Sequence, residues 1–294
     1  MIRAALAAMI LAAPAASAMA ESYPEAKKVL SIGGTLTEIV YALGEQGRLV
    51  GRDTTSSYPA AALALPDVGY VRALSPEGVL SVGPDLIIAD QGAGPPEALS
   101  VLKGANIPFV EVPDTYSAEG IVTKITLVAD ALGVPDKGAA LAGKVRTDLS
   151  DIADLGAKVE APKKVMFILS LQGGRIMAGG EGTAADAIIS LAGGTNALQG
   201  ISGYKPITDE AVTAAQPDVI LMMDRGAADA DAAANGSSDH AQASQNALDL
   251  AAIKTTPAGQ NGAVVFMDGL LLLGFGPRTA EAARELHHAI YKAE

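Results

Sequence analysis

The sequence predicts an α/β protein made of two lobes that are joined by a single long helix, with a ligand cleft between the lobes. Apolar runs of four to six residues, each ended by glycine or proline, alternate with helical stretches, as is typical of a mainly parallel sheet. A central segment has helical spacing and no strand signal. Several motifs then recur in the same order in both halves, so we expect each lobe to be Rossmann-like.

These patterns divide the 294-residue chain into four segments. We expect a signal peptide over 1–20, a first α/β lobe over 21–135, a connecting helix over 136–160 and a second α/β lobe over 161–294. The length fits two ordinary domains, and 49% hydrophobic residues provide for a sizeable core.

In the first half, four short apolar runs predict buried strands at 29–32, 49–52, 86–89 and 109–112. Helices are expected over 38–43, 78–82, after the loop 92–96, and over 118–132. Thr35 and Glu38 have capping-box spacing, so we expect their side chains to close the amino end of the first helix. Ser75 and Pro76 predict the start of the second helix.

The segment 136–159 is predicted to be one helix. Its apolar residues recur at helical spacing, at Leu141, Val145, Leu149, Ile152 and Leu155. A helix of about 20 residues spans about 30 Å, a length that suits a connector between lobes.

The second half repeats the first. Gly69-Tyr70, a capped Glu77, Pro84-Asp85 and the apolar run 86–89 are followed later by Gly203-Tyr204, Glu210 after Thr208, Pro217-Asp218 and 219–222. Four matches in the same order predict two lobes of one architecture. Further strands are expected at 165–169 and 264–267, helices up to Leu191 and over 277–292, and an exposed insertion over 227–244.

The amino terminus resembles a secretory signal. Met1-Ile2-Arg3 is positively charged, the residues up to Ala16 are almost all apolar, and Ala18-Met19-Ala20 matches an A-x-A cleavage site. The apolar run is shorter than the roughly 20 residues that span a bilayer. Because the chain has no cysteine, we expect no lipid anchor at the cleavage site. The sequence therefore predicts a soluble, exported protein.

Composition excludes several classes of function. A net charge of −12 argues against a nucleic-acid partner, which would need a basic surface. The absence of cysteine excludes thiolate catalysis, iron–sulfur clusters and cysteine-based zinc sites. No nucleophile elbow or phosphate-binding loop follows a predicted strand, so we do not expect an enzyme. A zinc or manganese carrier would need clustered ligands, and His240, His287 and His288 are read as surface residues.

Tyr70 and Arg72 are the most informative pair. They lie two apart in what we expect to be an extended segment, so a phenol and a guanidinium should point to the same side. From the spacing alone, an ordinary tyrosine and a solvated arginine explain the pair equally well.

Together with its surroundings, this motif resembles the haem-binding proteins of bacterial haem-uptake ABC importers, within the class that also carries vitamin B12 and siderophores. The residues that carry the resemblance are 29–39, 65–78, 172–175 and 178–186. The resemblance covers essentially the whole mature chain, and its most specific part is Gly-Tyr-x-Arg at 69–72.

The resemblance implies that Tyr70 is the axial ligand of the iron of haem b, which is carried as cargo in the periplasm. Tyrosinate is a known axial ligand of haem iron, and its free pKa near 10 means that the ferric ion must favour the anion. Arg72 would either support this anion or bind a haem propionate.

Further residues follow from the resemblance and the repeat. Tyr204 is the counterpart of Tyr70, and Lys205 and Arg175 are candidates for propionate contacts, although rim and turn positions explain all three equally well. Glu77 and Glu210 would dock onto an inner-membrane ABC permease with its ATPase, although the helix dipole alone explains an acid at each position. A ferric-siderophore or vitamin B12 carrier is the alternative, and a monomer is the default.

Overall fold

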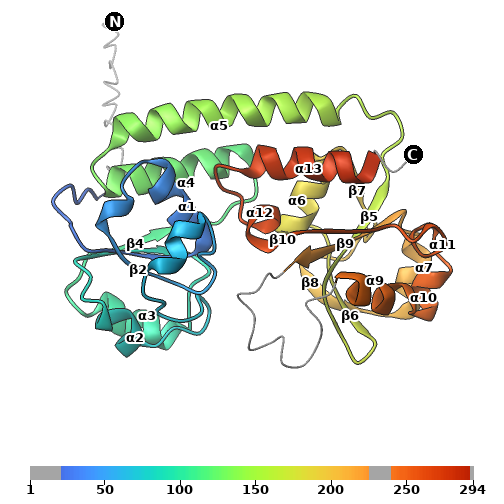
Figure 1. The fold of residues 1–294 in the computed structure, drawn as a ribbon, viewed down its shortest axis with the longest axis horizontal. Coiled ribbons are helices and arrows are strands. Elements are labelled where there is room, and N and C mark those ends of the chain that lie inside the picture. Colours follow the sequence, from blue (N-terminus) through green and yellow to red (C-terminus); the bar gives the residue numbers. More distant parts are fainter. Residues whose placement is uncertain (1–20, 225–239, 292–294) are drawn as a thin grey trace, which may run out of the picture.

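The computed structural model describes residues 21–224 and 240–291 and shows two α/β lobes side by side (Figure 1). The first lobe contains a four-stranded sheet and the second a six-stranded sheet. The two-lobed α/β fold class predicted from the sequence is thereby confirmed. The predicted signal peptide over 1–20 lies outside the described residues, and the division into segments at 135 and 160 stays a prediction.

The sheet of the first lobe is parallel throughout, with strand order β2-β1-β3-β4. All four predicted strands are confirmed: β1 (Val29–Ile32), β2 (Leu49–Arg52), β3 (Leu86–Asp90) and β4 (Phe109–Val112). One face packs against α1 (Gly34–Ala42) and α4 (Ala118–Ala131), and the other against α2 (Pro76–Ser81) and α3 (Pro96–Lys103). Successive residues of each strand point alternately to the hydrophobic core under α1 and α4 and to the core under α2 and α3. Both faces of the sheet are therefore buried, as is typical of parallel sheets.

The second lobe has a mixed sheet, with strand order β10-β9-β5-β6-β8. The predicted strands are confirmed as β5 (Lys164–Gln172), β9 (Val219–Asp224) and β10 (Val264–Asp268), which are parallel. The sequence did not predict β6 (Arg175–Gly179) or β8 (Tyr204–Ile207), which pair antiparallel. Gly173 and Gly174, with φ of 56° and 77°, form a tight hairpin turn between β5 and β6, a conformation that glycine adopts without strain.

The remaining elements are shorter or lie at the edges of the sheets. They are η1 (Gln46–Arg48), η2 (Ala60–Ala64), α6 (Ala184–Leu191), β7 (Thr195–Asn196), α7 (Asp209–Ala215), α9 (His240–Leu248), α10 (Ala251–Lys254) and α11 (Pro257–Asn261). The insertion expected over 227–244 lies mostly outside the described residues, and its last residues, 240–244, form the start of α9.

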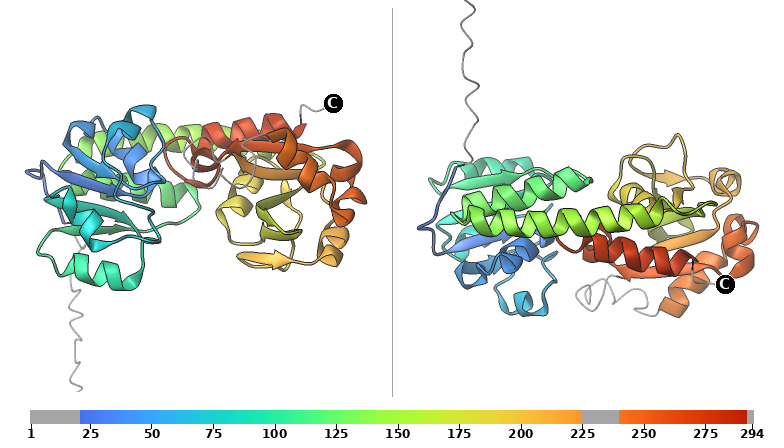
Figure 2. Two further views of the ribbon diagram at one scale, coloured as in Figure 1. Left: turned by 60° about the horizontal axis from the view of Figure 1, so that its bottom comes forward. Right: turned by 90° about the horizontal axis from the view of Figure 1, so that it is seen from above.

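Helix α5 (Pro135–Gly156) runs over both lobes (Figure 1) and is seen lengthwise from above in Figure 2. Its 22 residues correspond to about 33 Å. The predicted helical spacing is correct: Val145, Leu149 and Ile152 are buried, and α5 packs on α4, α6 and α13. It therefore spans the junction between the lobes.

A second junction is made by the carboxyl-terminal part of the chain. After α12 (Gly269–Leu273), residues 274–278 lie against the first lobe before α13 (Thr279–Tyr291) begins. The hydroxyl of Thr35 donates to the carbonyl oxygen of Gly274 at 2.6 Å, and Arg278 donates to the Glu38 carboxylate at 3.0 Å. The lobes are thus connected by more than α5.

These contacts correct the capping-box prediction. Helix α1 begins at Gly34 with Gly33 as its N-cap, and no side chain caps it. Thr35 and Glu38, which have the spacing of a capping box, instead bind a segment some 240 residues away. The other predicted caps are confirmed, since Ser75 and Thr208 accept hydrogen bonds from Gly78 and Ala211.

Lys124 of α4 is the buried centre of the second junction. Only 1% of its side chain is exposed, and its ammonium donates to Asp114 Oδ1 at 2.6 Å and to the carbonyl oxygens of Gly274 and Phe275 at 3.3 Å. A buried ammonium is tolerated only when such acceptors surround it.

We predict that Lys124→Met lowers the free energy of unfolding by about 3 kcal/mol, because it leaves the Asp114 carboxylate and two carbonyls without their donor. Urea denaturation followed by circular dichroism measures this change. The control is Lys144→Met, which removes an exposed i,i+4 pair with Asp148 and should cost no more than about 0.5 kcal/mol. Equal midpoints for the two variants would show that the buried ammonium does not stabilise the junction.

Candidate functional site

The segment that carries Tyr70 lies along the carboxyl end of β2. The amide of Arg52 donates to the carbonyl of Pro66, and the amide of Val68 donates back to the carbonyl of Arg52, both at 2.9 Å. The amide of Thr54 then donates to the carbonyl of Gly69 at 3.0 Å. These hydrogen bonds place the segment beyond the carboxyl ends of the strands, where α/β proteins bind their ligands.

Asp67 fixes this segment through its side chain. One carboxylate oxygen accepts from the guanidinium of Arg52 at 3.0 Å, and the other accepts from the Gly69 amide at 2.8 Å and the Thr54 hydroxyl at 3.2 Å. Gly69 has a φ of 103°, which side chains of other residues disfavour. Asp67 and Gly69 together therefore determine where the next residue, Tyr70, is placed.

The expected extended conformation at Tyr70 and Arg72 is wrong. The amide of Ala73 donates to the carbonyl of Tyr70 at 2.8 Å, so the chain turns and the alternation of side chains does not apply. The turn is attached to the next loop, since the amide of Gly94 donates to Val71 and the amide of Leu74 donates to Gly94.

Tyr70 is available to a ligand. Its side chain is 48% exposed, and its hydroxyl forms no hydrogen bond with the other residues that the structure describes. A large aromatic side chain that is both clamped through its backbone and exposed is suited to contact a bound molecule.

Tyr204, the counterpart in the second lobe, has a different environment. It begins β8, and its ring lies 6.3 Å from that of Phe167, edge to face. Burial raises the pKa of Tyr204, while hydrogen bonds with the Ala185 amide and the Thr183 hydroxyl and the charge of Arg72 oppose the increase. The phenol of Tyr204 therefore faces the amino end of α6, the end of a helix that favours negative charge.

The two lobes face each other at this point. Arg72 and Asp114 of the first lobe both act electrostatically on Tyr204 of the second, and Tyr204 and Asp90 act on Tyr116. We call the group Arg72, Asp90, Asp114, Tyr116 and Tyr204 the interlobe site. Burial, with the nearby carboxylate of Asp114, raises the pKa of Tyr116 well above its usual range.

Asp90, Asp114 and Tyr116 were missed by the sequence analysis. Asp90 ends β3, and Asp114 and Tyr116 follow β4 closely. The carboxyl ends of parallel strands lie at one edge of the sheet. The position of these three residues directly after predicted strands was therefore the sequence signal that could have identified them.

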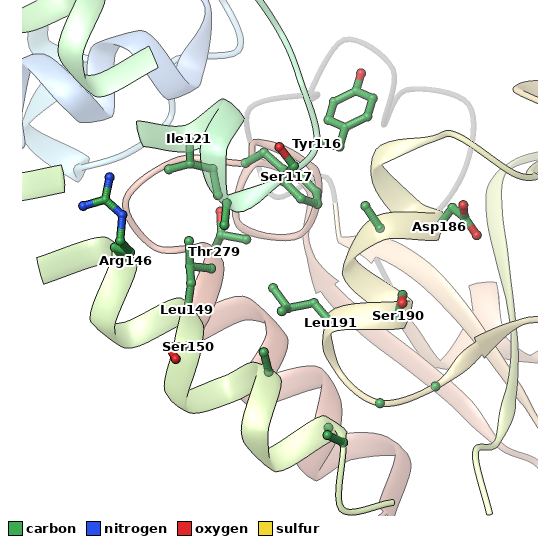
Figure 3. A pocket seen from close by; sticks show the side chains of 18 of the residues that line it. Tyr116, Ser117, Ile121, Arg146, Leu149, Ser150, Asp186, Ser190, Leu191 and Thr279 are labelled. Carbon is green, nitrogen blue, oxygen red and sulfur yellow. The ribbon is translucent and has the colours of Figure 1, made fainter. Parts of the chain in front are cut away.

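A cavity of about 820 Å³ lies between the lobes. Figure 3 shows side chains that line it, among them Leu149 of α5, Ile121 of α4 and Leu191 of α6. Tyr116 and Phe275 belong to its lining, together with Leu149 of α5 and Asp186 and Leu191 of α6. Tyr116 thus belongs both to this cavity and to the interlobe site, whereas Tyr70, Arg72 and Tyr204 do not line the cavity.

The other predicted residues lie on the surface. Lys205 follows Tyr204 in β8, and the alternation of a strand directs its exposed side chain to the opposite face. Arg175 is exposed at the start of β6, beside the hairpin turn. Glu77 and Glu210 are exposed in the first turns of α2 and α7, one in each lobe.

Two structural findings bear on the class of protein. Within 21–224 and 240–291, His, Cys, Asp and Glu side chains form no cluster that could hold a metal ion. Among the same residues, no helix has the length and apolar composition that crossing a bilayer requires.

A model of the periplasmic binding protein family matches residues 29–270. The chain belongs to that family. Among solved structures, the periplasmic heme-binding protein BhuT, in complex with two hemes, is 42% identical with a TM-score of 0.82, covering 91% of this chain and 98% of that one. The heme-binding protein RhuT from Roseiflexus sp. RS-1, in its apo form, is 37% identical with a TM-score of 0.83 and the same coverage.

Other similar proteins are not haem-binding by name. The vitamin B12-binding protein BtuF of Vibrio cholerae is 27% identical with a TM-score of 0.72, covering 91% of this chain and 98% of that one. An uncharacterized ABC transporter substrate-binding lipoprotein of Bacillus subtilis, YvrC, is 28% identical over 91% of this chain and 81% of its own length. The family and the solved relatives are thus periplasmic binding proteins, which are not enzymes, and YvrC is a substrate-binding protein of an ABC transporter.

We predict that Asp67→Ala accelerates hydrogen exchange at the Gly69 amide roughly tenfold, because that amide loses its carboxylate acceptor. Exchange followed by mass spectrometry on peptides that cover 65–74 measures this. The amides of β3 serve as the internal control and should not change. Equal exchange rates at Gly69 in both proteins would contradict the role of Asp67 as the clamp of this segment.

Proposed function

We propose that this protein captures haem between its lobes through Tyr70 and delivers it to an ABC importer. The observation that carries the proposal is the exposed phenol of Tyr70, held on a segment clamped by Asp67 at the carboxyl edge of a parallel sheet. The similarity to haem-binding relatives at up to 42% identity supports the choice of ligand.

The chemistry of Tyr70 fits an iron ligand. A phenolate is an anionic oxygen donor that suits ferric iron, and tyrosinate is an axial ligand that proteins use for haem. Since no described residue accepts or donates a hydrogen bond at its hydroxyl, coordination would cost the phenol its proton, released to solvent, but no hydrogen bond with these residues. The exposed side chain leaves room for the flat ring of a tetrapyrrole.

Arg72 supplies the positive charge of the proposed site. It is exposed, and it makes no ion pair within 4.0 Å among the described residues. The charge of Arg72 acts on both Tyr204 and Asp90, so Arg72 lies on the side of the first lobe that faces the second lobe. We assign it to a haem propionate, with support of the tyrosinate as its alternative role. Tyr204 then closes the site from the second lobe. Arg175, on the neighbouring strand β6, has a lesser part, whereas Lys205 points to the opposite face of β8 and is not assigned to haem.

Delivery is assigned to Glu77 and Glu210. Both are exposed, each lies in the first turn of a helix, and the N-caps Ser75 and Thr208 hold the two helices in the same way. One acid on each lobe matches a permease that contacts both lobes at once. Export to the periplasm through the signal at 1–20 and action as a monomer complete the proposal.

A carrier of cobalamin or of a ferric siderophore is the second candidate. The relative that binds vitamin B12 supports it, since that protein has the same fold over nearly its whole length. Neither of these ligands needs an axial tyrosine, so Tyr70 separates the two candidates.

We predict that ferric haem binds the purified protein with a tyrosinate-type absorption spectrum and that Tyr70→Phe weakens binding roughly 100-fold, because the bond to iron is lost. Absorption titration measures both. The matched control is Tyr58→Phe, another exposed tyrosine of the first lobe, which should bind like the wild type. Tight binding of cobalamin with no haem spectrum would reject haem as the bound molecule. If Tyr70→Phe binds haem with wild-type affinity and spectrum, only the assignment of Tyr70 as the iron ligand is rejected.

We further predict that Glu77→Lys together with Glu210→Lys reduces haem uptake by cells roughly tenfold while leaving haem affinity unchanged, because both permease contacts are reversed in charge. Glu97→Lys is the control, since Glu97 is also an exposed acid in a first helical turn. Normal uptake by the double variant at normal affinity would rule out the docking role.

A further inference from the structure

Asp90 is a carboxylate in the interlobe site that the proposed function has not used. It ends β3, and one of its oxygens accepts a hydrogen bond from the Gly92 amide at 3.0 Å. No ion pair within 4.0 Å joins it to a cation of the described residues. The residue therefore brings a negative charge to the carboxyl edge of the sheet without a direct partner.

The neighbouring carboxylate, Asp114, is different because it is compensated. It forms the 2.6 Å ion pair with Lys124, and the hydroxyl of Tyr116 also binds it. Lys124 and Arg72 act on Asp90 only at longer range, and neither forms an ion pair with it. Of the two acids at this edge, Asp90 is thus the one whose charge a bound molecule would meet.

The side chain of Asp90 is held in place. Gly33 has a φ of 123°, and a Cβ at this position would lie 3.0 Å from the Asp90 Cβ, so the glycine lets the two backbones approach closely. The loop after β3 is fixed as well, because Gly94 exchanges hydrogen bonds with Val71 and Leu74 on either side of Arg72. Asp90 and Arg72 therefore stand on two loops that are bonded to each other.

These two neighbouring loops thus bring a positive charge, on Arg72, and a negative charge, on Asp90, to one edge of the first lobe. Burial, and the charge of Asp114, raise the pKa of Asp90, which is what a carboxylate without a close cation shows. An anionic group of a ligand gains energy beside Arg72 and loses energy beside Asp90. A ligand with carboxylates on one edge only can set that edge against Arg72 and an uncharged part against Asp90.

We infer that Asp90 is a specificity-determining residue that selects tetrapyrroles with carboxylates on a single edge and turns that edge towards Arg72. The inference rests on the proposed function, since it requires a tetrapyrrole in the interlobe site. Haem meets the condition, because its two propionates lie at one edge. Ferric coproporphyrin III does not, because it carries one propionate on each of its four rings.

The test compares ferric protoporphyrin IX with ferric coproporphyrin III by absorption titration of the full-length protein. The wild type should prefer the former, and Asp90→Asn should reduce this preference about fivefold, mainly by tighter binding of coproporphyrin, because one repulsive charge is removed. Asn keeps an acceptor for the Gly92 amide. Asp90→Ser is the second variant, and it should behave in the same way if Asn disturbs folding.

The control is Asp85→Asn, which removes one charge just before the other end of β3, where Asp85 accepts hydrogen bonds from the amides of Lys27 and Lys28. It should leave the preference unchanged. If Asp90→Asn weakens both porphyrins equally, Asp90 only positions Arg72 and the inference is wrong. An unchanged preference in both Asp90 variants also overturns it. If the wild type binds neither porphyrin, the proposed function fails first and the inference falls with it.

Discussion

The arrangement of the lobes depends on the contact between the buried ammonium of Lys124 and the segment that precedes α13. An amine that is almost fully removed from water needs acceptors, and it finds them in Asp114 of the first lobe and in the carbonyls of Gly274 and Phe275. The segment before α13 is therefore held against α4. Because Asp114 is part of the same contact, the position of the interlobe site is coupled to the junction behind it.

Two connections rather than one restrict the lobes. Helix α5 spans both, and the contacts of Thr35, Glu38 and Lys124 attach the carboxyl-terminal segment to the first lobe. Burial raises the pKa of Glu38, and the adjacent Arg278 opposes this increase. Any closure on a ligand must preserve these contacts, which favours small movements over a wide hinge.

The sequence was most reliable where the physics is local. Short apolar runs such as Val29–Ile32 are strands because both faces of a parallel sheet are buried, and that is visible without tertiary information. The capping box predicted at Thr35 and Glu38 was wrong, because a local helix cap and a long-range contact use the same residue types. The strands β6 and β8 were missed because glycine at a hairpin turn and glycine in a loop look alike in sequence.

The Gly-Tyr motif occurs in both halves of the chain, but its two tyrosines lie in different structural environments. Gly69 has a φ of 103° and Gly203 a φ of 76°, so both tyrosines follow a backbone bend that glycine permits. Tyr204 then enters an edge strand, where its ring packs edge to face on Phe167 and burial raises its pKa. Tyr70 instead enters a turn, and its hydroxyl has no partner among the described residues. The internal symmetry thus places two phenols on facing lobes, one on an edge strand and one on a turn.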